Sequence, residues 1–135
     1  MPIPCDDRKM QVTLSEWSVP AVGGTSYEHD LGTGPFDAND LVGRLDGERF
    51  DLLTVEADSV TLFVGGGPTV FYVTAATGDG QRTAVGGDGD DLVEIQYGGQ
   101  LVDLPSRMIV DRSVAVEAVD SALRDGSLAS TLRWA

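Results

Sequence analysis

The glycines of this chain are concentrated in one stretch, and their positions constrain the fold more than any other feature. Ten of the 17 glycines lie between Gly65 and Gly99, where they separate short runs of β-branched and aromatic residues. Glycine readily adopts the positive φ angles that tight turns between strands require. The spacing therefore predicts short strands that follow one another along the chain and pair as an antiparallel meander.

The runs between these breaks have the composition of strands, since they are rich in Val, Thr, Phe and Tyr. An earlier strand is predicted at residues 10–14, where apolar and polar residues alternate. Residues 21–35 are rich in Gly, Ser and Thr and predict a loop. The other predicted strands cover residues 50–55, 60–64, 69–74, 82–85, 92–97 and 100–104.

One helix is predicted before these strands and one after them. The first follows Asp37, a favourable N-cap residue, and ends at Gly47. The second covers residues 112–125, between the N-cap Asp111 and the terminating Gly126. We find no internal repeat and no domain boundary. The whole chain is therefore predicted to be one α+β domain, in which both helices pack on one face of an antiparallel sheet of about five to seven strands.

The net charge of the chain indicates which classes of partner it can bind. Nine basic residues stand against 22 acidic ones, and the net charge at pH 7 is -13. Such a negative field repels phosphate backbones and anionic membranes, so neither a nucleic acid nor a membrane is the expected partner. It favours a basic protein, because opposite charges accelerate association. The alternative interpretation is that the acidity only confers solubility.

Residues suited to catalysis or to thiolate metal binding are few. Cys5 is the only cysteine, so the chain forms no internal disulfide. His29 is the only histidine and lies between Glu28 and Asp30 in the predicted loop. It is interpreted as a solvated loop residue, with a general base assisted by Glu28 or Asp30 as the alternative. We therefore expect no enzymatic activity, no cofactor and no metal.

The sequence contains no recognisable targeting signal or membrane-spanning segment. Its first seven residues lack the basic start and apolar run of a signal peptide. No stretch approaches the roughly 20 apolar residues that span a bilayer. The cytoplasm is the expected compartment.

Acidic residues gather in two places that are candidate contact surfaces. Residues 86–94 match one copy of a calcium-binding nonapeptide repeat, which normally binds each ion between successive copies. The acidic residues of this segment either hold a hard cation or form an exposed acidic hairpin that contacts a protein. A second acidic group lies on the first predicted helix. Tyr97, an aromatic residue that follows the first group, is a possible anchor for a protein partner. The candidate contact residues are Asp88, Asp90, Asp91, Glu94, Tyr97, Asp37 and Asp40.

The C-terminal part of the chain has a distinctive order of features. Residues 110–119 predict an alanine-bearing helix, Gly126 stops it, and Leu132-Arg133-Trp134 places a final aromatic residue after an arginine. In this order and spacing, residues 36–134 resemble the first immunity-protein family of bacterial polymorphic toxin systems.

The middle of the chain extends the resemblance to about three quarters of its length. A glycine-interrupted strand pair at residues 60–73 is similar to that family, as is the Gly87-Asp88 turn before residues 93–97. Two departures stand beside these matches. Residues 1–35 have no counterpart, and Leu101-Val102 occupies a position where the family commonly has an aromatic residue.

The resemblance implies an α+β protein that binds and neutralises a toxin domain encoded beside it. Members are often found next to nucleic-acid deaminase toxins, so a cytidine deaminase domain is the expected partner. The resemblance transfers no catalytic residues, which agrees with the expectation of a binding protein.

Overall fold

The computed structural model describes residues 11–17, 26–32 and 35–135. Its larger sheet has six strands, and a separate pair of strands forms a hairpin. The sheet contains β1 (Gln11–Trp17), β2 (Ser26–Gly32), β3 (Phe50–Glu56), β4 (Val60–Gly66), β5 (Phe71–Thr77) and β6 (Gly80–Thr83). The hairpin contains β7 (Leu92–Tyr97) and β8 (Gln100–Pro105), and the helices are α1 (Ala38–Gly43), α2 (Arg112–Asp125) and a 3-10 turn at Ser106–Met108.

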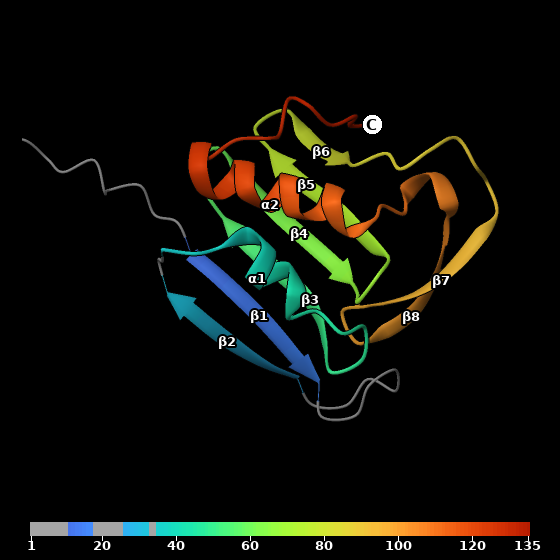
Figure 1. Ribbon diagram of the computed structural model, residues 1–135, viewed down its shortest axis with the longest axis horizontal. Helices are drawn as coiled ribbons and strands as arrows, with labels where there is room; N and C mark the ends of the chain where they lie inside the picture. Colours follow the sequence, from blue (N-terminus) through green and yellow to red (C-terminus); the bar gives the residue numbers. More distant parts are fainter. Residues whose placement is uncertain (1–10, 18–25, 33–34) are drawn as a thin grey trace, which may run out of the picture.

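The predicted α+β class is confirmed, and most of the sheet is a meander. Its strand order is β2-β1-β3-β4-β5-β6, and all neighbours are antiparallel (Figure 1). The strands from β3 to β6 follow one another in both sequence and space. Strand β1 lies at the centre of the other half, paired with β2 on one side and β3 on the other.

The prediction of a loop at residues 21–35 is wrong for residues 26–32, which form the edge strand β2. This strand was hidden by its composition, because its residues 27–30 are all exposed and it lacks the alternation of a half-buried strand. Pairing with β1 supplies the backbone hydrogen bonds that its sequence does not indicate. Residues 21–25 and 33–34, and Met10 of the predicted first strand, lie outside the described residues.

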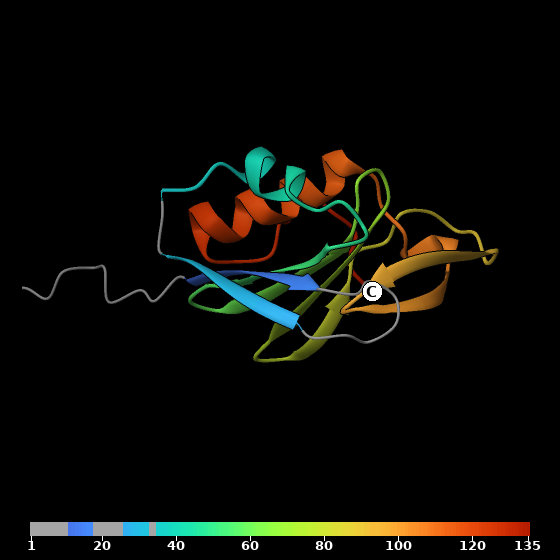
Figure 2. The same cartoon turned by 90° about the horizontal axis from the view of Figure 1, so that it is seen from below.

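Both helices pack on the same face of the larger sheet, as predicted (Figure 2). Alternate residues of the central strands point into this layer because the side chains of a strand alternate between its two faces. The buried sheet residues on this face are Val12, Leu14, Leu53, Val55, Leu62, Val64, Phe71, Val73 and Ala75. The helices cover them with Leu41, Val42, Ala115, Ala118, Val119 and Ala122.

The second helix has the predicted limits. The carboxylate of Asp111 accepts a hydrogen bond from the backbone N–H of Val114 at 3.1 Å, which caps the first turn. Gly126 adopts a φ of 68° at the C-terminal end, where glycine avoids the steric cost of the left-handed conformation. The signals at both ends were therefore correct.

The first helix is shorter than predicted, because it ends at Gly43 and not at Gly47. Asp37 caps it as expected, by accepting from Asn39 N–H at 2.9 Å. After Arg44 the chain turns, and the Asp46 carboxylate accepts from the backbone N–H groups of Glu48 and Phe50. This local hydrogen bonding competes with the helix and stops it before Gly47.

The end of the chain is extended, as predicted. Trp134 forms a bridge with Ala84, and its indole N–H donates to the carbonyl of Ala129 at 3.0 Å. Thr83 and Ala135 exchange two backbone hydrogen bonds, so the terminal residues pair with the outer side of β6. Among the described residues, no helix is both long and apolar enough to cross a membrane.

Candidate functional site

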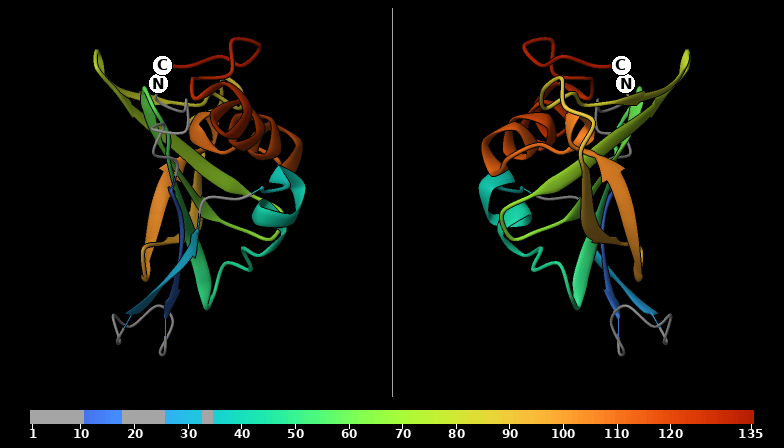
Figure 3. Two further views of the ribbon diagram at one scale, coloured as in Figure 1. Left: turned by 90° about the vertical axis from the view of Figure 1, so that its left-hand side faces the viewer. Right: turned by 90° about the vertical axis from the view of Figure 1, so that its right-hand side faces the viewer.

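The hairpin formed by β7 and β8 leaves the plane of the larger sheet (Figures 1 and 3). Its turn residues, Gly98 and Gly99, have φ angles of 62° and 84°. These positive values suit a two-residue turn that matches the twist of the strands. The pairing is regular over all six residue pairs, from Tyr97 with Gln100 to Leu92 with Pro105.

One side of the hairpin packs against the larger sheet. Ile95 is buried, and the ring of Tyr97 meets Tyr72 edge-on at a centroid distance of 5.2 Å. A Cβ atom at Gly65 would lie 1.9 Å from this ring, so glycine makes the close approach possible. Burial raises the pKa of Tyr97, and a hydrogen bond with Thr74 partly opposes this rise. The predicted contact residue Tyr97 is thus half-buried and holds the hairpin.

A buried carboxylate also holds the tip of the hairpin. Asp51 is fully buried, and its Oδ2 atom accepts from the backbone N–H of Gly99 at 2.7 Å and from Gln96 Nε2 at 3.0 Å. The same Gln96 amide donates to the carbonyl of Glu48. Asp51 Oδ1 has no hydrogen-bond partner among the described residues. Sequence analysis missed this role, because an aspartate between Phe50 and Leu52 gives no sign of its distant partners.

The opposite side of the hairpin is exposed except at Gln96, which is buried against Asp51. Leu92 and Leu101 are 68% and 52% exposed, whereas most large apolar residues in the described part of the chain are buried or half-buried. Glu94 and Asp103 are exposed and lie opposite each other in the strand register. We call Leu92, Glu94, Leu101 and Asp103 the hairpin outer face. It combines two apolar side chains with two carboxylates that form no ion pair with the described residues.

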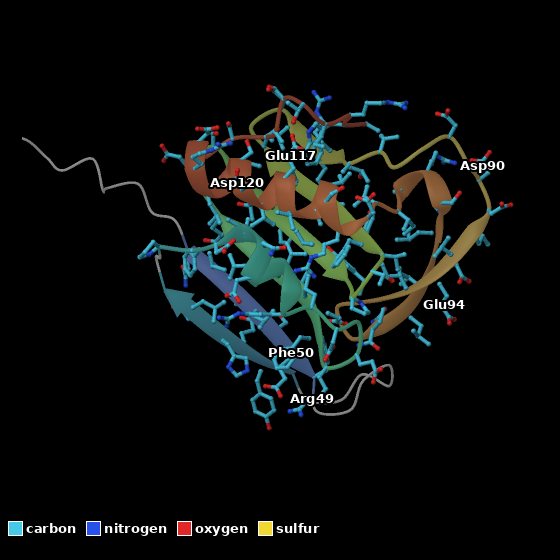
Figure 4. All side chains as sticks on the ribbon, viewed as in Figure 1. Arg49, Phe50, Asp90, Glu94, Glu117 and Asp120 are labelled. Atoms are coloured by element: carbon cyan, nitrogen blue, oxygen red, sulfur yellow. The ribbon has the colours of Figure 1, made fainter. Side chains whose placement is uncertain are left out.

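The segment before β7 adds further carboxylates beside the hairpin outer face, as Asp90 and Glu94 show in Figure 4. Asp88, Asp90 and Asp91 are all exposed. Backbone hydrogen bonds from Arg107 N to Gly89 O and from Ser106 N to Asp91 O hold this segment against the end of β8. The structure therefore brings the predicted contact residues Asp88, Asp90, Asp91 and Glu94 to one side of the molecule.

These carboxylates do not converge. Asp90 pairs with Arg107, and Asp88 pairs with Arg133 at 3.8 Å. No group of three or more His, Cys, Asp or Glu side chains in the described part of the chain is arranged to hold a metal ion. The other two predicted contact residues, Asp37 and Asp40, lie on α1, where Asp37 is the N-cap and Asp40 pairs with Arg44. The two acidic groups thus occupy separate places.

His29 lies at a groove of about 460 Å³ beside β1, β2 and β3. Its Nε2 atom is 2.7 Å from Glu16 Oε1, and Arg49 pairs with the same carboxylate. Arg49 also lies over the ring of Phe50, 5.9 Å from its centroid (Figure 4). His29 therefore lies on strand β2 and not in the predicted loop. Its partner is Glu16 of β1, whereas the alternative had named Glu28 or Asp30, which point away from it because neighbouring residues of a strand face opposite sides.

We expect Glu16→Gln to remove a pH-dependent part of the stability. The hydrogen bond with His29 holds the pKa of Glu16 below its ordinary value of 4.5, burial opposes this, and Arg49 adds to the lowering. A lowered carboxyl pKa stabilises the fold above the unfolded pKa, and this contribution is lost as pH falls through the folded value. Urea unfolding should therefore show that the difference between wild type and variant shrinks as pH falls below 4.5.

The exposed carboxylate of Glu56 at the end of β3 offers a matched control, Glu56→Gln. A difference that stays constant with pH for Glu16→Gln would show that the Glu16–His29 pair does not support the fold.

Comparison with known proteins adds no assignment. No protein-family model matches the chain, and no curated protein matches its sequence significantly.

Proposed function

We propose that this protein is an immunity protein, which binds and neutralises a basic bacterial toxin domain through the hairpin outer face. The observation that carries this proposal is the combination of Leu92 and Leu101, both exposed, with the carboxylates of Glu94 and Asp103. Binding energy at protein interfaces is concentrated in a few apolar or aromatic anchors, and surrounding charges select the partner and accelerate its approach.

The distribution of charge supports a basic partner. Most of the described arginines are already bonded within the chain, as Arg44, Arg49, Arg107 and Arg124 are to nearby carboxylates. Asp91, Glu94 and Asp103, by contrast, form no ion pair with a basic residue in the described part of the chain. A toxin that acts on nucleic acid needs a basic surface for the phosphate backbone, and an acidic inhibitor occupies such a surface favourably.

The likeness of residues 36–134 to an immunity-protein family supports a deaminase-type toxin as the first partner to test. A cytidine deaminase domain has to bind a polynucleotide, so it carries the positive surface that this proposal requires. We place the encounter in the cytoplasm, where the nucleic acid is. The protein acts here as an inhibitor by contact and performs no chemistry of its own.

Co-expression tests the proposal. The toxin domain encoded by the neighbouring gene should be harmless to cells that also produce this protein, and the two should purify as one complex. Cells producing the toxin alone should lose viability. Continued toxicity in the presence of this protein, with no complex on purification, would remove the basis for an immunity function.

A further inference from the structure

We infer that the partner docks by adding an extended basic segment to the outer edge of β8, which pairs with no strand among the described residues. This inference rests on the proposed function and specifies the binding mode of the same hairpin. An extended segment that joins a sheet edge gains affinity from backbone hydrogen bonds and specificity from alternate side chains. Three properties of the hairpin favour this mode.

The first property is the direction of the backbone groups of β8. In an antiparallel pair, hydrogen-bonded and non-hydrogen-bonded residue pairs alternate, and Tyr97 and Gln100 flank the two-residue turn as a bonded pair. Counting from this pair, Leu101 and Asp103 direct their N–H and C=O groups away from β7. Pro105 has no N–H group, so it marks the end of the usable edge.

The second property is that β8 is the outer strand of the hairpin. Strand β7 packs on β3 and β4, and a Cβ atom at Gly66 would lie 2.5 Å from Ile95 of β7. Figure 3 shows the hairpin on the side of the sheet away from the helices. Among the described residues, no strand pairs with the outer side of β8, so this is the side on which a partner strand would add.

The other edges of the fold are less suited to strand addition. Strand β6 has only four residues, and its last one, Thr83, already exchanges two hydrogen bonds with Ala135 on its outer side. Strand β2 pairs irregularly with β1, with a register shift between Val12 and Thr13. Such irregularities bend a strand and make its edge less suitable for pairing. The β7–β8 ladder has no such shift.

The third property is the side chains that flank this outer edge. A strand beside β8 would meet Leu101 and Asp103 in turn, with Glu94 on the same face. A second copy of this edge would bring like charges together, which destabilises pairing. A strand that alternates basic and apolar residues would place a cation opposite Asp103, on the same face as Glu94. The edge therefore selects a basic segment and disfavours self-association.

Strand addition makes a specific prediction for a probe peptide, an octapeptide of alternating lysine and valine with blocked ends. Its binding should shift the amide NMR signals of Leu101 and Asp103 and slow their hydrogen exchange. When a lysine lies opposite Asp103 in antiparallel pairing, the backbones of these two residues bond to each other. The backbone N–H groups of the lysines then face β8, and those of the valines face solvent. N-methylation of the lysine amides should abolish binding, whereas N-methylation of the valine amides should not.

The two methylated peptides carry the same charge and the same number of methyl groups, so they are matched controls. Equal binding of both would show that the backbone edge is not used and would overturn the inference. Peptide-induced shifts confined to β2 or α1, or no shift at all, would also overturn it.

A variant extends the test to the toxin encoded by the neighbouring gene. Leu101→Pro removes the outward N–H and should weaken the complex by about tenfold or more, whereas Leu101→Ala keeps this N–H and should weaken it less. A dispersed NMR spectrum verifies that each variant is folded. If wild type binds the toxin and Leu101→Pro binds equally well, edge addition is wrong and the immunity function stands. If wild type does not bind, the immunity function fails, and the peptide experiment still decides on the edge.

Discussion

Asp51→Ala should lower the free energy of unfolding by about 2 to 4 kcal/mol, because it removes an acceptor that two buried donors share. These donors are the backbone N–H of Gly99 and the side-chain amide of Gln96, at 2.7 and 3.0 Å from Asp51 Oδ2. Both belong to the hairpin, so the loss should be local at first. Hydrogen exchange should accelerate across β7 and β8 before it does in β4 and β5.

Asp51→Asn is the matched control for this loss. Its side-chain oxygen keeps the acceptor for Gly99 and Gln96, and its amide replaces Oδ1, which has no partner among the described residues. The variant should therefore stay within about 1 kcal/mol of wild type in urea unfolding. A loss for Asp51→Asn as large as that for Asp51→Ala would mean that the charge of Asp51, and not its role as an acceptor, holds the hairpin.

Neutralising the hairpin carboxylates should slow association with the toxin domain by about tenfold or more at low salt. The variant Asp91→Asn/Glu94→Gln/Asp103→Asn removes three charges that form no ion pair within the described residues. Its stability should consequently change by less than about 0.5 kcal/mol. Association rates measured at several salt concentrations should also depend less on salt than those of wild type, since fewer charges are left for salt to screen.

A second triple variant distinguishes the effect of the hairpin charges on association from the effect of the total net charge. Glu28→Gln/Glu56→Gln/Asp79→Asn removes the same number of charges from exposed positions on β2, at the end of β3 and in the turn before β6. It should slow association much less, because steering depends on charges near the contact. Equal slowing by both variants would show that net charge alone drives association and that the interface lies elsewhere.

Local signals predicted most of the fold. The glycine breaks and β-branched runs located β3 to β8 to within a few residues, because turns and strand propensity act over short stretches. Asp111 and Gly126 located α2 for the same reason, since a capping residue acts on its own helix end. The first helix was overextended because Asp46 competes for the backbone in a way that helical periodicity does not show.

The features that were missed depend on residues far apart in the sequence. Strand β2 exists because β1 pairs with it, and His29 finds Glu16 only across that pairing. Asp51 and Gly99 are separated by 48 residues, so neither indicates the other. The separate placement of Asp37 at α1 and Asp90 beside the hairpin was predicted, but their pairing with distant residues, such as Asp90 with Arg107, was not.

Inhibition of the purified toxin domain tests the central claim most directly. The measurement is the rate of the toxin's reaction on nucleic acid while this protein is added in increasing amounts. The account predicts that toxin activity falls in proportion to the protein added and is lost at an equimolar ratio. At low concentrations of both proteins, more of the variant Asp91→Asn/Glu94→Gln/Asp103→Asn than of wild type should be needed for the same inhibition. Full toxin activity in a large molar excess of this protein would contradict the account.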